Sequence, residues 1–240
     1  MNVAVILAGG VGSRVGAGCP KQFIDIFGKP VLAYTIENFQ NHKQIDAIEV
    51  VCLKEYQQYL QEIVNQNGYS KVKWITDGGV DFQQSVLNGI NNLKGKLEKE
   101  DIILVHYGAS PFVSEEIITD AIAVCKEKGN CTSGTPCYLL TGSNDDGEKS
   151  TTWVDRDKIM QLNSPQCFKF GYVIKIYEEA IEKDLLGKVE PHTTSLMYEL
   201  GHTIYFSKGN QTNIKITTKE DVELFKAYVY YKENYKKENE

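Results

Sequence analysis

The first turn of the chain holds the residues that are best suited to bind a charged ligand. An apolar segment, Val3–Leu7, runs into Ala8-Gly9-Gly10-Val11-Gly12-Ser13-Arg14, and Lys21 follows shortly afterwards behind Pro20. Glycines permit positive φ and let backbone N–H groups approach a ligand closely, so such a loop can form an anion-binding concavity. Arg14 and Lys21 add positive charge, and Pro20 stiffens the segment that carries the lysine. The pattern predicts a phosphate-binding loop, with an ordinary tight turn as the alternative.

Two common phosphate-binding motifs do not match this loop. A Walker loop needs Gly-Lys-Ser/Thr after its glycines, and no such sequence follows. The glycines Gly10, Gly12 and Gly16 depart by one position from the dinucleotide fingerprint, and no acidic residue ends a second strand at the expected distance. A nicotinamide-dependent oxidoreductase is therefore disfavoured.

The elements around the loop follow an alternating pattern. Strand-length apolar segments alternate with longer amphipathic ones, as in α/β proteins whose helices cover both faces of a mostly parallel sheet. We expect strands at Val3–Leu7, Ala47–Cys52, Val72–Thr76, Ile102–Val105, Thr203–Phe206 and Ile214–Ile216. We expect helices at Val31–Phe39, Lys54–Asn65, Phe82–Leu93, Ser114–Lys128, Tyr172–Lys183, Thr194–Leu200 and from about Lys219. Ser114 is a typical N-cap, because its side chain can accept from the unpaired backbone N–H groups at a helix start and the acidic residues after it favour that end. The pattern predicts a single domain over residues 1–240.

Composition excludes several classes of partner. The net charge of -6 argues against a nucleic-acid surface, which needs an excess of Lys and Arg. The six cysteines form no Cys-x-x-Cys pair and no zinc-ligand spacing, so we expect reduced thiols. No apolar run is long enough to span a bilayer, and the N-terminus does not resemble a secretory signal. We expect a cytoplasmic protein with no membrane partner.

One segment differs from the rest of the chain. Residues 138–152 are rich in Gly, Ser, Asn, Asp and Thr, which is typical of turns. We expect a hairpin arm over residues 137–163 that projects from the domain.

Several motifs in one order resemble a known family, the cytidylyltransferases that act on 2-C-methyl-D-erythritol 4-phosphate or on ribitol 5-phosphate. The resemblance covers nearly the whole chain, and it rests on the order of the motifs more than on any one of them. The motifs are Leu7 to Arg14, Pro20-Lys21-Gln22, Phe27-Gly28-Lys29-Pro30-Val31-Leu32, Gly78-Gly79 with Ser85-Val86 and Asn88-Gly89, Val105 to Phe112, Asp155-Arg156, Ser164-Pro165-Gln166, and Asn213-Ile214-Lys215-Ile216-Thr217.

The resemblance implies a Rossmann-like nucleotidyltransferase fold and a phosphoryl-transfer reaction. A phosphate oxygen of the acceptor attacks the α-phosphorus of CTP, and pyrophosphate leaves. Arg14, Lys21 and Lys215 are the implied catalytic residues, and Mg²⁺ is the implied cofactor, held mainly by the phosphates. The implied nucleotide-binding residues are Leu7, Ala8, Gly9, Gly10, Gly12, Gly79 and Ser85.

The departures from the family pattern lie at the acceptor end. Tyr107 replaces an Asp, Ser110 and Phe82 each replace an Arg, and Pro191-His192 replaces Thr-Asp. Thr141 is the nearest counterpart of an arm threonine, although it is about one residue out of register. The implied acceptor-binding residues are Tyr107, Ser110, Thr141, Arg156, Ser164 and His192. We expect His106 to be a hydrogen-bonded structural residue, because an ionised phosphate needs no general base.

The resemblance also implies a homodimer in which the arm reaches the partner's site. We expect an enzyme that couples CTP to a small polyol or sugar phosphate, with ribitol 5-phosphate favoured over 2-C-methyl-D-erythritol 4-phosphate. A homologue that binds CTP or a CDP compound without turnover is the alternative, because a carboxylate is lost at Tyr107.

Overall fold

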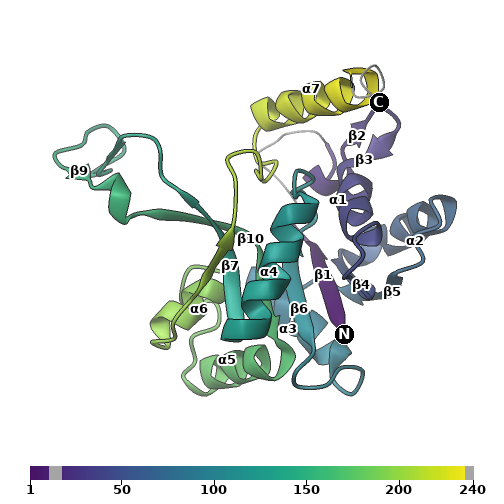
Figure 1. Ribbon diagram of the computed structural model, residues 1–240, viewed down its shortest axis with the longest axis horizontal. Coiled ribbons are helices and arrows are strands. Elements are labelled where there is room, and N and C mark those ends of the chain that lie inside the picture. Colours follow the sequence, from purple (N-terminus) through teal and green to yellow (C-terminus); the bar gives the residue numbers. More distant parts are fainter. Residues whose placement is uncertain (11–17, 236–240) are drawn as a thin grey trace.

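A seven-stranded sheet forms the centre of the molecule in the computed structural model, which describes residues 1–10 and 18–235 (Figure 1). The strand order is β11-β7-β10-β6-β1-β4-β5, and β10 is antiparallel to both of its neighbours. The remaining strands share one direction, so the sheet is mostly parallel. The strands are β1 (Asn2–Ala8), β4 (Ala47–Cys52), β5 (Val72–Asp77), β6 (Ile102–Tyr107), β7 (Asn130–Pro136), β10 (Met160–Lys169) and β11 (Phe206–Lys208).

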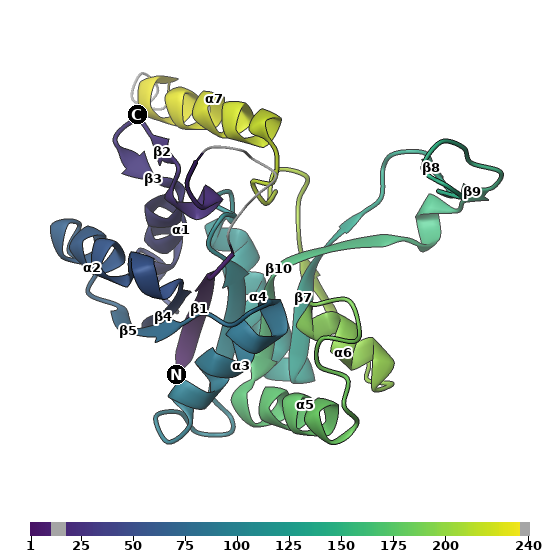
Figure 2. The same cartoon turned by 180° about the vertical axis from the view of Figure 1, so that it is seen from behind.

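Helices cover both faces of the sheet. One buried cluster joins the sheet to α1 (Val31–Gln40), α2 (Gln57–Gln66) and α4 (Glu115–Lys128). A second cluster on the other face contains side chains of α3 (Phe82–Leu93), α5 (Phe170–Glu182) and α6 (Thr193–Glu199). Figure 2 shows α3, α5 and α6 on the side opposite to α4. The predicted α/β fold with a mostly parallel sheet is confirmed.

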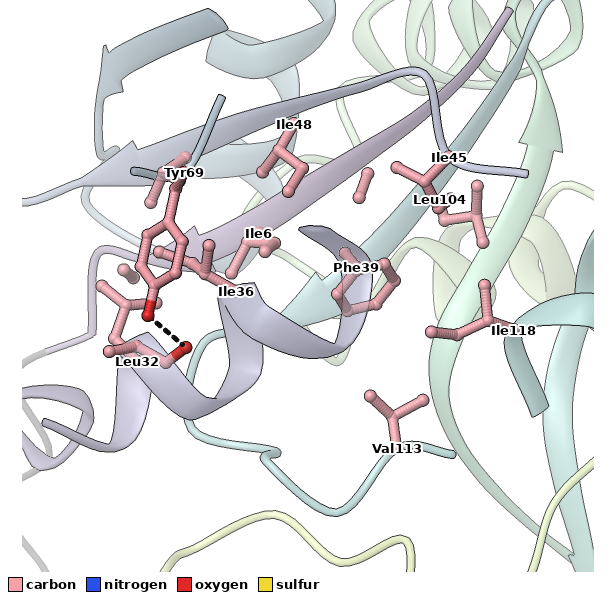
Figure 3. Packing of buried hydrophobic residues seen from close by; sticks show 14 of the residues in the cluster. Ile6, Leu32, Ile36, Phe39, Ile45, Ile48, Tyr69, Leu104, Val113 and Ile118 are labelled. Atoms are coloured by element: carbon pink, nitrogen blue, oxygen red, sulfur yellow. Dashed lines mark hydrogen bonds between the residues drawn. The ribbon is translucent and has the colours of Figure 1, made fainter. Parts of the chain in front are cut away.

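Side chains along the central strand β1 point alternately to the two faces of the sheet, and this explains why a buried core forms on each face. In β1, Ala4 and Ile6 belong to the first cluster, whereas Val3 and Val5 belong to the second. Successive side chains of a strand point to opposite faces, so a strand buried on both faces is apolar throughout. Figure 3 shows the first cluster, where Phe39 of α1 packs near Ile6 and the Tyr69 hydroxyl donates to the backbone oxygen of Ala33 at 3.4 Å. Burial of each large apolar side chain contributes about 1.5–3 kcal/mol.

A third apolar cluster attaches the last helix, α7 (Lys219–Tyr235), to the domain. Phe225 of α7 meets Phe112 at 5.1 Å between ring centroids, and both pack with Ile216. This cluster fixes the segment before α7 against the loop after β6. The shorter elements are η1 (Lys21–Phe23), β2 (Asp25–Ile26), β3 (Lys29–Pro30), η2 (Lys54–Tyr56), β8 (Thr141–Gly142), β9 (Trp153–Val154) and η3 (Arg156–Lys158).

Local signals predicted several elements well, and Ser114 caps α4 by accepting from the backbone N–H of Ile117 at 3.3 Å. Two strand predictions were wrong. Ile214–Ile216 is not a strand, because the N–H of Ile216 donates to Ala109 in the loop after β6 and the N–H of Ile214 donates to Thr212 in its own segment. The prediction at Thr203–Phe206 is displaced, since β11 begins at Phe206. The strands β7 and β10 were missed because their polar side chains show no regular apolar alternation.

An arm leaves the domain between β7 and β10, and both views show it extending away from the sheet (Figures 1 and 2). The small sheet of β8 and β9 lies near its tip, and η3 follows. The segment expected as the arm, residues 137–163, contains these elements and the first residues of β10. Among the described residues, no helix combines the length and apolarity that a membrane crossing requires.

Candidate nucleotide-binding pocket

A pocket of about 240 Å³ opens at the carboxyl ends of β1 and β6. This edge is where open α/β sheets bind ligands, because loops from neighbouring strands converge there. Loops after β1 and β5, the first turn of α3 and the segment before α7 all contribute. The described lining residues are Leu7, Gly9, Gly10, Lys21, Gln22, Gly79, Asp81, Phe82, Ser85, Tyr107, Ala109, Lys215 and Thr217.

Close backbone packing forms the floor of this pocket. A Cβ on Gly9 would lie 3.3 Å from the Cα of Gly78, and a Cβ on Gly79 would lie 2.6 Å from the backbone of Gln84. The Ser85 hydroxyl accepts from the N–H of Gly79 at 3.0 Å and donates to the carbonyl of Asp81 at 2.7 Å. Ser85 therefore ties the double-glycine turn to the start of α3.

Neighbouring residues of η1 connect the glycine loop to a distant segment. The Nζ of Lys21 donates to the carbonyl of Ile216 at 2.6 Å. Gln22 is buried, and its Nε2 donates to the carbonyls of Ala8 at 2.7 Å and Gly10 at 2.8 Å. Sequence reasoning did not select Gln22 as a site residue, although its place in Pro20-Lys21-Gln22 was a signal.

The second lysine of the pocket reaches it from the chain segment before α7. The N–H of Ile216 donates to Ala109 at 2.8 Å, and the hydroxyl of Thr217 donates to the carbonyl of Lys215 at 3.0 Å. The Nζ of Lys215 lies 4.1 Å from the centroid of the Tyr107 ring. Lys21 and Lys215 thus line one pocket despite their separation in the sequence.

Three of the residues that depart from the family pattern form one aromatic cluster beside the pocket. Ring centroids of Phe82 and Tyr107 are 5.7 Å apart, those of Phe82 and His192 are 4.8 Å apart, and those of Tyr107 and His192 are 5.9 Å apart. Burial, and to a smaller degree the Glu190 carboxylate, raises the pKa of Tyr107, so its phenol stays neutral. Phe82 lines the pocket, although from the sequence it was expected only as a departure from the family pattern.

A carboxylate fixes the histidine of this cluster. The Oε1 of Glu190 is in close contact with Nδ1 of His192, and its Oε2 accepts from the His192 backbone N–H at 3.2 Å. The Ser195 hydroxyl also donates to Glu190. Burial acts to raise the pKa of Glu190, but these hydrogen bonds outweigh it and hold the pKa below its usual value. Glu190 is therefore ionised near neutral pH.

His106 and Ser110 lie behind the pocket and not in its lining. Both side chains are fully buried, and Nε2 of His106 lies 3.0 Å from the carbonyl oxygen of Ser110. Burial lowers the pKa of His106 to about 4, so the imidazole is neutral at physiological pH. A buried neutral ring with a backbone partner is suited to a structural role.

The remaining expected acceptor residues do not meet this pocket within the same chain. Thr141 is in β8 and donates to the carbonyl of Leu139 at 3.2 Å, and Arg156 in η3 donates to the carbonyl of Tyr138 at 2.8 Å. Both belong to the arm (Figure 2). Ser164 is buried in β10, where its carbonyl accepts from Asn213 at 2.8 Å.

Arg14 and Gly12 lie outside the described residues. Ala8 is buried beneath the pocket, and its carbonyl holds Gln22.

Comparison with known proteins identifies the class of protein. The family model "IspD: 2-C-methyl-D-erythritol 4-phosphate cytidylyltransferase" matches residues 2–231, and the chain belongs to this family of nucleotidyltransferases. A ribitol-5-phosphate cytidylyltransferase of Lacticaseibacillus paracasei is 36% identical over 97% of this chain and 100% of its own length. A 2-C-methyl-D-erythritol 4-phosphate cytidylyltransferase of Clostridium acetobutylicum is 37% identical over 98% of this chain and 99% of its own length.

Solved structures agree on the fold. The crystal structure of 4-diphosphocytidyl-2C-methyl-D-erythritol synthase from Anaerococcus prevotii superimposes with a TM-score of 0.79, covering 96% of this chain and 98% of that one. Its sequence identity is 22%, so this likeness concerns the fold alone.

Proposed function

We propose that this cytidylyltransferase transfers CMP from CTP to a small phosphorylated polyol, with ribitol 5-phosphate as the favoured acceptor, and releases pyrophosphate. The observation that carries the proposal is the pocket itself, where Lys21 and Lys215 lie beside the glycine-loop backbone. Two ammonium groups beside a glycine-rich backbone suit a triphosphate, because both ammonium groups and backbone N–H groups stabilise negative charge. The ribitol-5-phosphate cytidylyltransferases among the relatives support the choice of acceptor.

The reaction requires alignment and charge neutralisation from the protein. An acceptor phosphate oxygen forms a bond to the α-phosphorus of CTP while the bond to the pyrophosphate oxygen breaks. Lys21 and Lys215 would stabilise the charge that grows on the phosphates. The attacking phosphate is already ionised, so no general base is required, which is consistent with the burial of His106.

Cytosine recognition would depend on the backbone at the double-glycine turn. The Ser85 hydroxyl already bonds to Gly79 and Asp81, and this fixes the backbone groups that can read a small base edge. Fixed polar groups discriminate well, because a ligand that fails to pair with them leaves them unsatisfied.

The pocket fits an Mg²⁺ ion that is held mainly by phosphate oxygens and water. No group of three metal-ligating side chains occurs among the described residues, and Asp81 is the one carboxylate in the described lining. One oxygen of Asp81 accepts from the N–H of Gln84 at 2.7 Å as the cap of α3. Mg²⁺ usually keeps several waters and needs only one or two carboxylates besides substrate phosphates. When bound, the ion would neutralise phosphate charge.

The arm supports a homodimer in which each subunit completes the other's acceptor site. Its apolar side chains are unusually exposed, including Leu140 at 84%, Leu139 at 73% and Trp153 at 71%. An exposed apolar patch of this kind is typical of an interaction site. Thr141 and Arg156 lie on this arm, so a partner subunit would receive them together with the apolar surface.

Pyrophosphate release by the purified 240-residue chain tests the function. CTP, Mg²⁺ and a panel that contains ribitol 5-phosphate, 2-C-methyl-D-erythritol 4-phosphate and other polyol and sugar phosphates would be compared. We expect the highest kcat/KM with ribitol 5-phosphate. A preference for 2-C-methyl-D-erythritol 4-phosphate would support the alternative acceptor, which is the one in the name of the Clostridium relative. CTP binding without release across the whole panel would indicate a non-catalytic homologue.

A further inference from the structure

The side chain of Lys215 needs a support that its backbone does not provide. Its segment is fixed at Ile216, which donates to Ala109, and at Thr217, whose N–H donates to Asp221 at 2.7 Å. The ammonium, however, is at the end of a flexible four-carbon stem, and ordering such a stem costs conformational entropy. A partner that holds the ammonium in the pocket would reduce this cost when a ligand binds.

Tyr107 is placed to act as that partner. It ends β6 at the pocket edge, and its ring centroid is 4.1 Å from the Nζ of Lys215. An ammonium at this distance from an aromatic ring is attracted by the ring quadrupole, more strongly where water is excluded. Because burial raises the pKa of Tyr107, the ring carries no phenolate charge at neutral pH.

The ring of Tyr107 is itself held by two other aromatic side chains. Phe82, in the first turn of α3, lies at 5.7 Å between centroids, and His192, at the start of α6, lies at 5.9 Å. Glu190 bonds to both the ring and the backbone of His192. The support therefore comes from two separate parts of the chain, the first turn of α3 and the segment just before α6.

We infer that Tyr107 is a positioning residue, whose ring holds the Lys215 ammonium in the pocket, and that Phe82 and His192 keep that ring in place. The inference rests on the proposed triphosphate site. This role of Tyr107 offers a physical reason for the replacement of the aspartate that the family has at this position. A carboxylate at this position would attract the Lys215 ammonium with a full negative charge that offsets the lysine charge, whereas a neutral ring attracts the ammonium without offsetting its charge.

A double-mutant cycle on CTP affinity tests this inference in the absence of any acceptor. The variants are Tyr107→Leu, Lys215→Met and the double variant, with the CTP dissociation constant measured by calorimetry. We expect Tyr107→Leu to weaken CTP binding about tenfold, and Tyr107→Phe, which keeps the ring, to restore most of that loss. In the Lys215→Met background the Leu substitution should change affinity less than about twofold. Additive effects of the two substitutions would overturn the inference.

Tyr205→Leu is the matched control, because Lys128 lies 5.9 Å from the Tyr205 ring away from the pocket. It should leave CTP affinity unchanged. If Tyr107→Leu does not fold, His192→Ala replaces it, with an expected loss of about threefold that also disappears in the Lys215→Met background. A wild-type chain that does not bind CTP would overturn the proposed function and this inference together. Normal CTP binding with an additive cycle would overturn the inference alone.

Discussion

Two adjacent side chains of η1, Lys21 and Gln22, make different kinds of contact. Lys21 lines the pocket and bonds to Ile216, whereas Gln22 is buried and bonds to the carbonyls of Ala8 and Gly10. A single three-residue turn therefore joins the first loop of the chain to the segment that carries Lys215. In this arrangement the Lys21 ammonium lines the pocket, while the Gln22 amide fixes the backbone at Ala8 and Gly10.

Lys21→Ala should lower kcat/KM for CTP by about 100-fold, because one charge-stabilising donor is lost at the phosphates. Stability should fall by only about 1–2 kcal/mol, since the hydrogen bond to Ile216 is lost but no apolar core is disturbed. Steady-state pyrophosphate release and thermal unfolding would measure the two effects. Lys73→Ala removes an exposed lysine from β5 and serves as the control. Wild-type turnover by Lys21→Ala would contradict the assignment of this lysine.

Gly79→Ala should destabilise the chain by about 1–3 kcal/mol, because the added Cβ would lie 2.6 Å from the backbone of Gln84. The turn and the start of α3 would have to separate, and CTP affinity should fall as well. Gly10→Ala is the stability control, since its Cβ would meet no atom of the described residues within 4 Å. Equal unfolding midpoints in urea for the two variants would contradict this account.

At the scale of elements, a buried carboxylate connects the sheet to α3. Glu49 of β4 is fully buried, and its Oε1 accepts from Thr76 of β5 at 2.7 Å and from Asn92 of α3 at 2.7 Å. A Cβ on Gly89 would lie 3.2 Å from Oε2 of Glu49, so glycine leaves room for the carboxyl group. Burial is the largest influence and raises the pKa of Glu49 to about 7, against the effect of both hydrogen bonds.

Stability should therefore decrease as pH rises. The folded state holds the Glu49 proton more tightly than the unfolded state, so the stabilisation is complete below the unfolded pKa and is lost as pH approaches about 7. We expect the free energy of unfolding to fall by about 2–3 kcal/mol between about pH 5 and pH 8 from this group. Glu49→Gln should remove that part of the slope in urea titrations, whereas Glu62→Gln, an exposed change on α2, should not. An unchanged slope in Glu49→Gln would show that another group is responsible.

At the scale of the whole molecule, the arm of a single chain has no buried apolar cluster of its own among the described residues. Leu139, Leu140 and Trp153 are exposed, although the domain itself has three buried clusters. Two of the expected acceptor residues, Thr141 and Arg156, also lie on the arm and not at the pocket of the same chain. A second copy of the chain would cover the exposed apolar side chains of the arm, and its pocket would receive Thr141 and Arg156.

Mixing two inactive variants tests this assembly. If Arg156 acts in the partner's pocket, Arg156→Ala and Lys21→Ala should each be impaired, but a mixed dimer retains one intact site. Random exchange of equal amounts then makes half of the dimers mixed, so activity should recover to about one quarter of the wild-type value. The same variants assayed without exchange provide the control. Trp153→Ser should shift sedimentation toward the monomer, and an unchanged dimer would argue against an apolar arm contact.

Local chemistry in the sequence was enough to determine many elements. Apolar runs of strand length predicted β4, and the amphipathic pattern predicted α3 over its whole length. The Ser114 cap and the glycine run after β1 were also readable, because caps and turns depend on residues that are near one another in the chain. These signals, with the ordered motifs, were sufficient for the fold class and the family.

Only the tertiary structure decided which side chains share the pocket. Phe82, Tyr107 and His192 appeared in the sequence as separate departures, yet they pack together and Tyr107 contacts Lys215. The polar strand β7 and the long β10 were likewise hidden, because their burial depends on neighbours that come from elsewhere in the chain. The order of the strands in the sheet brings these distant segments together, and the apolar periodicity of a single segment does not predict that order.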